Sequence, residues 1–294
     1  MKHTKLTLIT SLIFIILVSA CGRSNTPSGT TAEATDTQTP TATQPPMAIT
    51  INNVGISVEE FQQELTRLQQ AQTQLGVSST PEEQKQKVID DFTDQLLLEQ
   101  GAYQAGFTLD HATLQARIDA LAAEMGGQDK LTAWESTNSY TADSFSEAMR
   151  RNIAVAWQRD QIANSVPITA DQVHVRQILV QTEETANEIL AQIKAGADFA
   201  TLALTYDPVT GGDLGWFPQG YLTQPEVDTA AFALQPGQTS EIIKSAIGYH
   251  IIFVIERDPQ HPLSPDARRV LQEKKLAEWL DAAKSSSQIT LNVP

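Results

Sequence analysis

The sequence has few basic residues, one cysteine and no apolar stretch long enough to span a bilayer comfortably. Its 294 residues include 20 Lys and Arg against 35 Asp and Glu, so we expect no nucleic-acid partner. A single cysteine, Cys21, excludes an intrachain disulfide. The uncharged apolar stretch at residues 6–18 is too short to span a bilayer comfortably. At this length the chain can bury a sizeable core and has room for roughly two domains.

Signatures of covalent and metal catalysis are also missing. No Ser or Cys lies in a nucleophile signature, and His111, His174 and His261 are not spaced as metal ligands. The pair Gly211-Gly212 is not a phosphate loop, because no Lys-Ser/Thr pair follows it. We therefore predict no metal and no cofactor.

Residues 1–20 have the pattern of a secretory signal peptide, with Lys2 and Lys5 before the apolar stretch. Residues 17–22, Leu-Val-Ser-Ala-Cys-Gly, resemble the lipobox of bacterial lipoproteins, which implies lipidation of Cys21. Several acyl chains would attach the protein stably, at about 0.8 kcal/mol per buried methylene. We expect a lipid anchor on the extracytoplasmic face of a membrane, at the cell surface or in the periplasm. The alternative is a cysteine buried in a membrane helix.

Residues 21–46 are predicted to form a disordered tether. From Gly22 to Pro46 there is no Leu, Ile, Val or aromatic residue, so this segment cannot bury a core. A flexible coil of this length would hold the folded part roughly 25–30 Å from the membrane.

Residues 47–168 are predicted to form a mainly helical module. Apolar and polar residues alternate over residues 48–56 up to a turn, which predicts a short strand at residues 48–53, and Ser57 with Glu60 forms a predicted capping box. Four amphipathic helices are expected at about residues 58–75, 81–103, 110–125 and 141–164. Their apolar faces are Phe61, Leu65, Leu68 and Leu75; Val88, Phe92, Leu96 and Tyr103; Leu114, Ile118 and Leu121; and Phe145, Met149, Ile153 and Trp157. The spacing favours a bundle core over a ligand groove.

After Val166-Pro167 the pattern changes to strands and short helices. Strands are predicted at residues 173–180, 239–243 and 249–255, with the extended segment 214–217 between helices. Helices are predicted around Ile189, Phe199 and residues 226–234. This order favours an antiparallel sheet with packed helices, and with the first module it predicts an α+β fold class.

Residues 173–257 resemble a parvulin-type (PpiC) peptidyl-prolyl isomerase domain. The matching blocks are Gln177-Ile178-Leu179-Val180, Ala195-Gly196-Ala197-Asp198-Phe199-Ala200, Gly211-Gly212-Asp213-Leu214-Gly215-Trp216-Phe217, Ala231-Phe232-Ala233-Leu234, Pro236-Gly237 and Gly248-Tyr249-His250-Ile251-Ile252. The resemblance implies a concave face that holds the proline of an X-Pro peptide.

The resemblance also implies the site residues. His250, Asp207 and Gln177 take the catalytic positions, with Gln177 where the family has a second histidine. The implied substrate-binding residues are Leu222, Phe232, Ser245, Trp216 and Phe217. A pocket phenylalanine expected within residues 224–227 is absent, and the loop at 207–211 is shorter than usual. Without the resemblance, His250 would be interpreted as a core histidine and Asp207 as a turn residue.

Rotation about an X-Pro amide needs no nucleophile or cofactor. The barrier is about 18–20 kcal/mol, and lowering it by about 4 kcal/mol accelerates rotation roughly a thousandfold. An apolar slot and a few hydrogen bonds that favour the twisted amide are sufficient. A neutral hydrogen bond contributes about 0.5–1.5 kcal/mol, so replacing the histidine by Gln177 predicts roughly a tenfold slower enzyme.

The ends of the folded part are predicted to meet. Residues 265–285 form a predicted helix and 289–293 a closing strand, after a linker at 258–265. The start of the helical module is similar to SurA-like and PrsA-like secreted folding factors, in which the C-terminal segment returns to the N-terminal module. The predicted domains are therefore 47–168, an inserted isomerase domain at 169–258, and 259–294 rejoining the first.

Three functions remain open from the sequence. The first is a peptidyl-prolyl isomerase and folding chaperone for exported polypeptides that contain X-Pro bonds. The second is a holdase with a weak or inactive parvulin domain, and the third is a structural lipoprotein. Residues 181–184, Gln-Thr-Glu-Glu, lack a basic cluster, so we expect no preference for phosphorylated clients. The sequence does not predict an oligomeric state.

Overall fold

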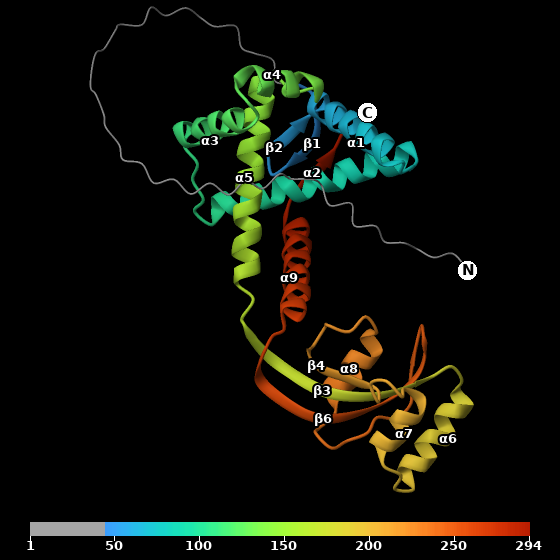
Figure 1. Ribbon diagram of the computed structural model, residues 1–294. Coiled ribbons are helices and arrows are strands. Elements are labelled where there is room, and N and C mark those ends of the chain that lie inside the picture. Colours follow the sequence, from blue (N-terminus) through green and yellow to red (C-terminus); the bar gives the residue numbers. More distant parts are fainter. Residues whose placement is uncertain (1–44) are drawn as a thin grey trace, which may run out of the picture. The chain divides into compact units, whose positions relative to one another are not determined.

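The computed structural model describes residues 45–294 (Figure 1). The predicted signal peptide, Cys21 and all of the predicted tether except Pro45 and Pro46 lie outside the described residues. Among residues 45–294, no helix combines the length and the apolar character needed to cross a bilayer.

A three-stranded sheet joins the first and last strands of the described chain. Its order is β2-β1-β7, with β1 at Met47–Ile51, β2 at Val54–Ser57 and β7 at Ile289–Leu291. Both pairings are antiparallel. The strand predicted at residues 48–53 is confirmed as β1, which ends at Ile51: Asn52 and Asn53, with φ of 50° and 70°, turn the chain into a hairpin with β2. Asparagine tolerates this left-handed conformation better than most residues.

Five helices follow between residues 58 and 164. They are α1 (Val58–Leu75), α2 (Pro81–Gln104), α3 (His111–Glu124), α4 (Gln128–Thr137) and α5 (Ala142–Asn164). The four predicted helices are confirmed, and α4 is additional. Its N-cap is Gly127, which has no side chain to bond the first turn, so the sequence carries no capping signal there.

The starts of α1 and α2 differ in their capping. At α2, Thr80 and Glu83 form a full capping box. At α1, Ser57 accepts from the backbone N–H of Glu60, but the reciprocal half of the box is not formed. The Glu60 carboxylate instead lies 2.7 Å from Nη1 of Arg151 on α5. A long-range ion pair has replaced the local bond, and it connects α1 to α5.

The predicted apolar faces form the cores of the helical module. Phe61, Val88, Phe92 and Leu96 are buried together with residues of β1 and β2, and α9 (Pro265–Ser286) packs Trp279 and Leu280 against them. Two predicted core residues are exposed: Leu75 is 67% exposed and Tyr103 is 43% exposed. Both lie in the last turn of their helix, and a helix end can leave its apolar face uncovered.

The second sheet has the order β4-β3-β6-β5, and all its pairings are antiparallel. Its elements are β3 (Thr169–Val180), α6 (Glu183–Lys194), α7 (Phe199–Tyr206), β4 (Asp213–Pro218), α8 (Pro225–Ala233), β5 (Ile243–Ser245) and β6 (Gly248–Pro262). The predicted α+β class, an antiparallel sheet with packed helices, is confirmed.

Two strand predictions for this sheet are corrected. The chain at Thr239 makes one bridge to Phe253, and the regular strand β5 begins only at Ile243. Residues 258–262, predicted as linker, continue β6 (Figure 1). The buried side chain of Gln172 donates to the carbonyls of His261 and Pro262, which holds this end of β6 to β3.

Helices cover both faces of this sheet. Val173 and Val175 of β3 pack with α8, whereas Ile178 and Val180 pack with α6 and α7. Alternate residues of a strand point to opposite faces, so the pair Val173 and Val175 and the pair Ile178 and Val180 lie on opposite faces of the sheet. The division of the chain into the predicted domains stays a prediction.

Candidate functional site

Three polar side chains form a hydrogen-bonded chain on the α8 face of the second sheet. Nδ1 of His250 lies 3.1 Å from Oε1 of Gln177, and Nε2 lies 2.7 Å from Oγ of Ser245. In the β3–β6 register, Gln177 faces Ile252 and Leu179 faces His250. Gln177 and His250 are therefore diagonal neighbours on one face, within reach of long side chains.

The bond pattern assigns a neutral imidazole to His250. The amide oxygen of Gln177 can only accept, so Nδ1 carries the proton and donates to it. Ser245 Oγ accepts from the backbone N–H of Ile247, and its own hydrogen can go to Nε2 over 2.7 Å or to the Gly248 carbonyl over 3.4 Å, so the much shorter contact favours donation to Nε2. His250 is 1% exposed, and this burial lowers its pKa below the ordinary value, opposed only in part by the Glu226 carboxylate.

The loop before β4 is held by one carboxylate. Asp207 accepts from the backbone N–H groups of Val209, Thr210 and Gly212 and from the Thr210 hydroxyl. These bonds, led by the Thr210 hydroxyl, lower the pKa of Asp207. Asp207 thus braces the loop that contains the glycine pair. Its predicted catalytic role stays a prediction.

The glycine pair brings this loop against Gln177. The backbone N–H of Gln177 donates to the carbonyl of Gly212 over 2.8 Å. A Cβ on Gly212 would overlap the carbonyl oxygen of Gln177, and Gly212 has a φ of +69°. Only glycine allows both this conformation and this close approach. The pair therefore positions the residue that bonds to His250.

An apolar cluster, here called the apolar wall, lies on the same face of the sheet as the polar chain. Phe217 and Val227 are fully buried in the α8-side core, and Leu222, Phe232 and Ile243 lie half-buried at its edge. Phe232 packs edge-to-face on Phe217, with ring centroids 6.1 Å apart. Of the predicted substrate-binding residues, Leu222, Phe232 and Ser245 keep exposed surface, whereas Phe217 supports the wall from behind.

The structure does not bring Trp216 to His250. Trp216 precedes Phe217 on β4 and so points to the opposite face. Its ring stacks on His261, with centroids 4.1 Å apart, and lies 5.6 Å from the His174 ring. His174 in turn bonds to Asp213 through Nε2, over 2.8 Å.

Two residues near the apolar wall, Asp171 and Arg257, were not predicted as site residues. Arg257 forms a two-point ion pair with Asp171, at 3.0 and 2.6 Å, and its guanidinium lies 5.7 Å from the Phe232 ring centroid. This pairing holds Arg257 over the ring. Asp171 and Arg257 are far apart in sequence, so no local motif marks them.

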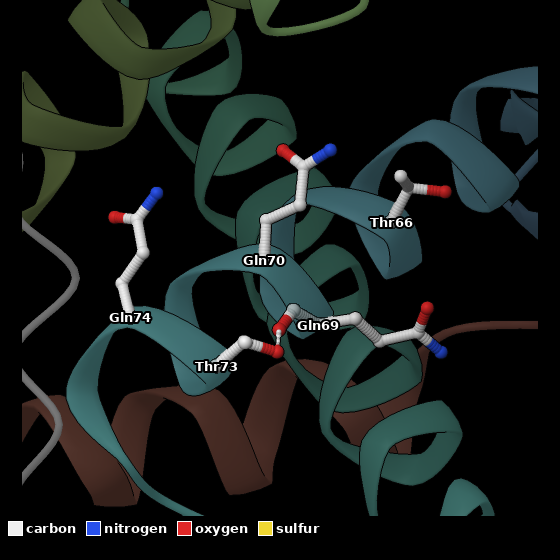
Figure 2. A pocket seen from close by; sticks show the side chains of 5 residues that line it. All are labelled: Thr66, Gln69, Gln70, Thr73 and Gln74. Carbon is white, nitrogen blue, oxygen red and sulfur yellow. Dashed lines mark hydrogen bonds between the residues drawn. The ribbon is translucent and has the colours of Figure 1, made fainter.

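Neither a metal-binding cluster nor the hollow on α1 competes with this face in the described residues. Within residues 45–294, no group of three or more His, Cys, Asp and Glu side chains could hold a metal ion. A shallow surface hollow of about 330 Å³ lies on α1. Figure 2 shows the side chains that line it, Thr66, Gln69, Gln70, Thr73 and Gln74. These uncharged side chains provide no acid or base, so we assign the candidate site to the His250 face.

Comparison with known families agrees with this geometry. The profile of the SurA-like N-terminal domain matches residues 1–159, more than half of the chain. The chain belongs to the SurA-like N-terminal domain family. The PPIC-type PPIASE domain, Rotamase, matches residues 169–256, which contain the second sheet and His250. Both predicted resemblances are confirmed.

Individual relatives match parts of the chain. It is 40% identical over 117 residues to "Foldase protein PrsA" of Geobacillus sp. (strain WCH70), over 38% of this chain and 42% of that protein. It is 35% identical over 144 residues to "Chaperone SurA" of Burkholderia thailandensis, over 42% of this chain and 32% of that protein. The chain thus spans less than half of the length of these curated relatives. The crystal structure of PrsA from Bacillus cereus aligns with TM-score 0.43 and 21% identity, over 83% of this chain and 87% of that chain.

The glycine pair generates a first prediction. Gly212→Ala should destabilise the protein by about 2–5 kcal/mol, because left-handed strain costs about 1–2 kcal/mol and overpacking about 1–3 kcal/mol more. Gly215→Ala is the matched control: its φ is +67°, and its Cβ would meet nothing within 4 Å. Urea unfolding should show a distinctly larger loss for Gly212→Ala. Equal losses would mean that contact with Gln177 does not matter.

The buried imidazole generates a second prediction. Because the folded-state pKa of His250 is lowered, the unfolded chain binds the proton more readily. Its contribution to stability should be complete above about pH 6.5 and be lost as pH falls toward the folded-state pKa. Urea midpoints from pH 8 to pH 5 should therefore fall less steeply for His250→Gln than for the parent. Parallel curves would contradict burial of a neutral His250.

Proposed function

We propose that this chain is a peptidyl-prolyl cis-trans isomerase and folding chaperone for exported proteins. The observation that carries the proposal is the Gln177–His250–Ser245 chain beside an apolar wall, inside the segment that matches a PPIC-type PPIASE domain. The printed names of the relatives, foldase and chaperone, support the same class.

The geometry is suited to non-covalent catalysis. Leu222 and Phe232 would receive the proline ring, and the partly buried polar groups would bond the twisted amide. His250 is proposed to orient Gln177 and Ser245, since both of its ring nitrogens are already bonded. Asp207 is proposed to act through the loop, since its carboxylate binds loop donors.

Gln177 is proposed to contact the substrate through its amide. Its Oε1 is bonded to His250, and no acceptor lies within hydrogen-bond distance of its Nε2 among residues 45–294. This N–H group can therefore donate to a substrate carbonyl. A neutral donor of this kind supports a modest isomerase.

The proposed clients are unfolded or partly folded exported polypeptides with X-Pro bonds. The segment at residues 181–184 offers no basic cluster, so no phosphate preference is proposed. The proposed location is the extracytoplasmic face of a membrane, through a signal peptide at residues 1–20, a lipidated Cys21 and a tether to residue 46. We further propose that the parvulin domain is inserted into the helical module. The antiparallel pairing of β7 with β1 supports this division.

The test of the isomerase proposal is acceleration of cis-to-trans conversion in a short X-Pro peptide. Gln177→His should raise the catalysed rate by up to about tenfold, because it restores a stronger hydrogen-bonding ring. His250→Ala should lower it by about tenfold or more, because Gln177 and Ser245 lose their common partner. His111→Ala, at an exposed histidine of α3, is the matched control and should change nothing.

Equal rates with and without the wild-type chain would overturn the isomerase proposal. The holdase alternative is favoured by residues 224–227, where the resemblance implies a pocket phenylalanine and neither the exposed Glu226 nor the buried Val227 supplies an aromatic ring. In that case the full chain should suppress client aggregation, and His250→Ala should suppress it equally well.

The anchor proposal has its own test. Cys21→Ala should shift the protein from the membrane fraction to the soluble fraction when cells are separated, because the acyl chains have no attachment point. Ser24→Ala serves as a nearby control that keeps the cysteine. A Cys21→Ala protein that stays in the membrane fraction would contradict lipid anchoring at this position.

A further inference from the structure

A buried carboxylate on α8 bonds to the turn that follows β4. Asp228 is 5% exposed. Its Oδ1 and Oδ2 each lie 2.9 Å from the backbone nitrogen of Gly220, so one N–H group is shared between both oxygens. No Lys, Arg or His side chain forms an ion pair with Asp228 among residues 45–294. The bond to Gly220 is thus its principal polar contact in the described part of the chain.

Burying a carboxylate with one N–H partner carries a desolvation cost, which suggests that the residue has a specific role. A carboxylate removed from water loses hydration that a single N–H group replaces only in part. The position near the start of α8 compensates to some extent, since the N-terminal end of a helix favours negative charge. An asparagine or a leucine would fill the same space with a lower desolvation cost. What only the aspartate provides is a charge-assisted hydrogen bond to the Gly220 N–H.

The turn held by Asp228 leads directly to the apolar wall. The backbone N–H of Tyr221 donates to the carbonyl of Pro218, which closes the turn, and Gly220 has a φ of +86°. The next residues, Tyr221 and Leu222, pack half-buried against the core that contains Phe217. Within residues 219–222, the backbone N–H of Gly220 is the group that donates a hydrogen bond to a side chain of α8, the Asp228 carboxylate. The position of Leu222 therefore depends on a segment that Asp228 attaches to α8.

We propose that Asp228 is a positioning residue for the proline slot, holding the 218–222 turn so that Leu222 forms one wall of the slot. The inference rests on the proposed isomerase function for the meaning of the slot, but the contact itself does not depend on it. Asp228 does not touch the substrate. It acts through Gly220, and its loss lets the slot open without removing any polar group of the Gln177–His250–Ser245 chain.

This role has a kinetic signature. Loosening one apolar wall weakens retention of the proline ring in both the ground state and the transition state. Asp228→Ala should therefore raise KM for an X-Pro peptide by about tenfold, the loss expected for one hydrogen bond to a charged group, and change kcat by less than about threefold. Asp228→Asn keeps an acceptor for the Gly220 N–H and should recover most of the affinity.

The test compares four full-length proteins: wild type, Asp228→Ala, Asp228→Asn and Gln172→Ala. Gln172 is the matched control, because it is also buried and bonds backbone groups, the carbonyls of His261 and Pro262, at the other end of the β3–β6 pair. Each variant is measured for KM and kcat, for the urea midpoint, and for amide hydrogen exchange in peptides covering residues 219–224.

The expected result is faster exchange at residues 219–224 and a raised KM in Asp228→Ala, with partial recovery in Asp228→Asn. Gln172→Ala should lose stability without either change. If Asp228→Ala and Gln172→Ala show the same exchange and the same KM, or if Asp228→Ala lowers kcat alone, the positioning role is overturned. An inactive wild type would overturn the proposed function, and exchange at residues 219–224 would still decide whether Asp228 holds the turn.

Discussion

The candidate site depends first on the antiparallel pairing of β3 with β6. This pairing extends from Thr169 opposite Pro262 to Val180 opposite Tyr249, and it places Gln177 and His250 diagonally on one face. A slip of one residue would move a side chain to the opposite face of the sheet. The hydrophobic patterns of both strands oppose such a slip, since helices cover each face and bury alternate residues.

Around this pairing, the site is supported by contacts to the backbone. Gly212 meets Gln177 through a backbone hydrogen bond, and the Asp207 carboxylate holds the loop that carries Gly212. Asp228 accepts a hydrogen bond from the backbone N–H of Gly220, in the turn that precedes Leu222. Polar side chains thus bond loops, whereas the wall itself is apolar. The side chains that bond one another beside the apolar residues are neutral, namely Gln177, His250 and Ser245, which is consistent with a site that rotates an amide without covalent chemistry.

Much of the fold follows from local signals. Thr80, Asp110 and Thr141 begin helices because their side chains bond backbone N–H groups three residues on. Gly106 and Gly196 lie at helix ends with positive φ, which glycine adopts at little cost. The predictions failed where the signal was not local. Gly127 begins α4 without a cap, Glu60 pairs with Arg151 instead of closing a box, and Gln172 extends β6 through a contact between residues far apart in sequence.

The sequence by itself determined most of the elements, their order and the α+β class, which depend on side-chain periodicity, caps and glycines that act over a few residues. The candidate site residues came from the resemblance to a PPIC-type domain. Only the tertiary structure decided which candidates meet. In the tertiary structure Gln177 and Ser245 both hydrogen-bond to His250. Trp216 lies on the opposite face of the sheet, and the Asp207 carboxylate bonds to its own loop. The tertiary structure also revealed Asp228, whose partner Gly220 is reached only when α8 folds back on the turn after β4. Contacts of this kind are set by strand register and packing, which no short sequence window contains.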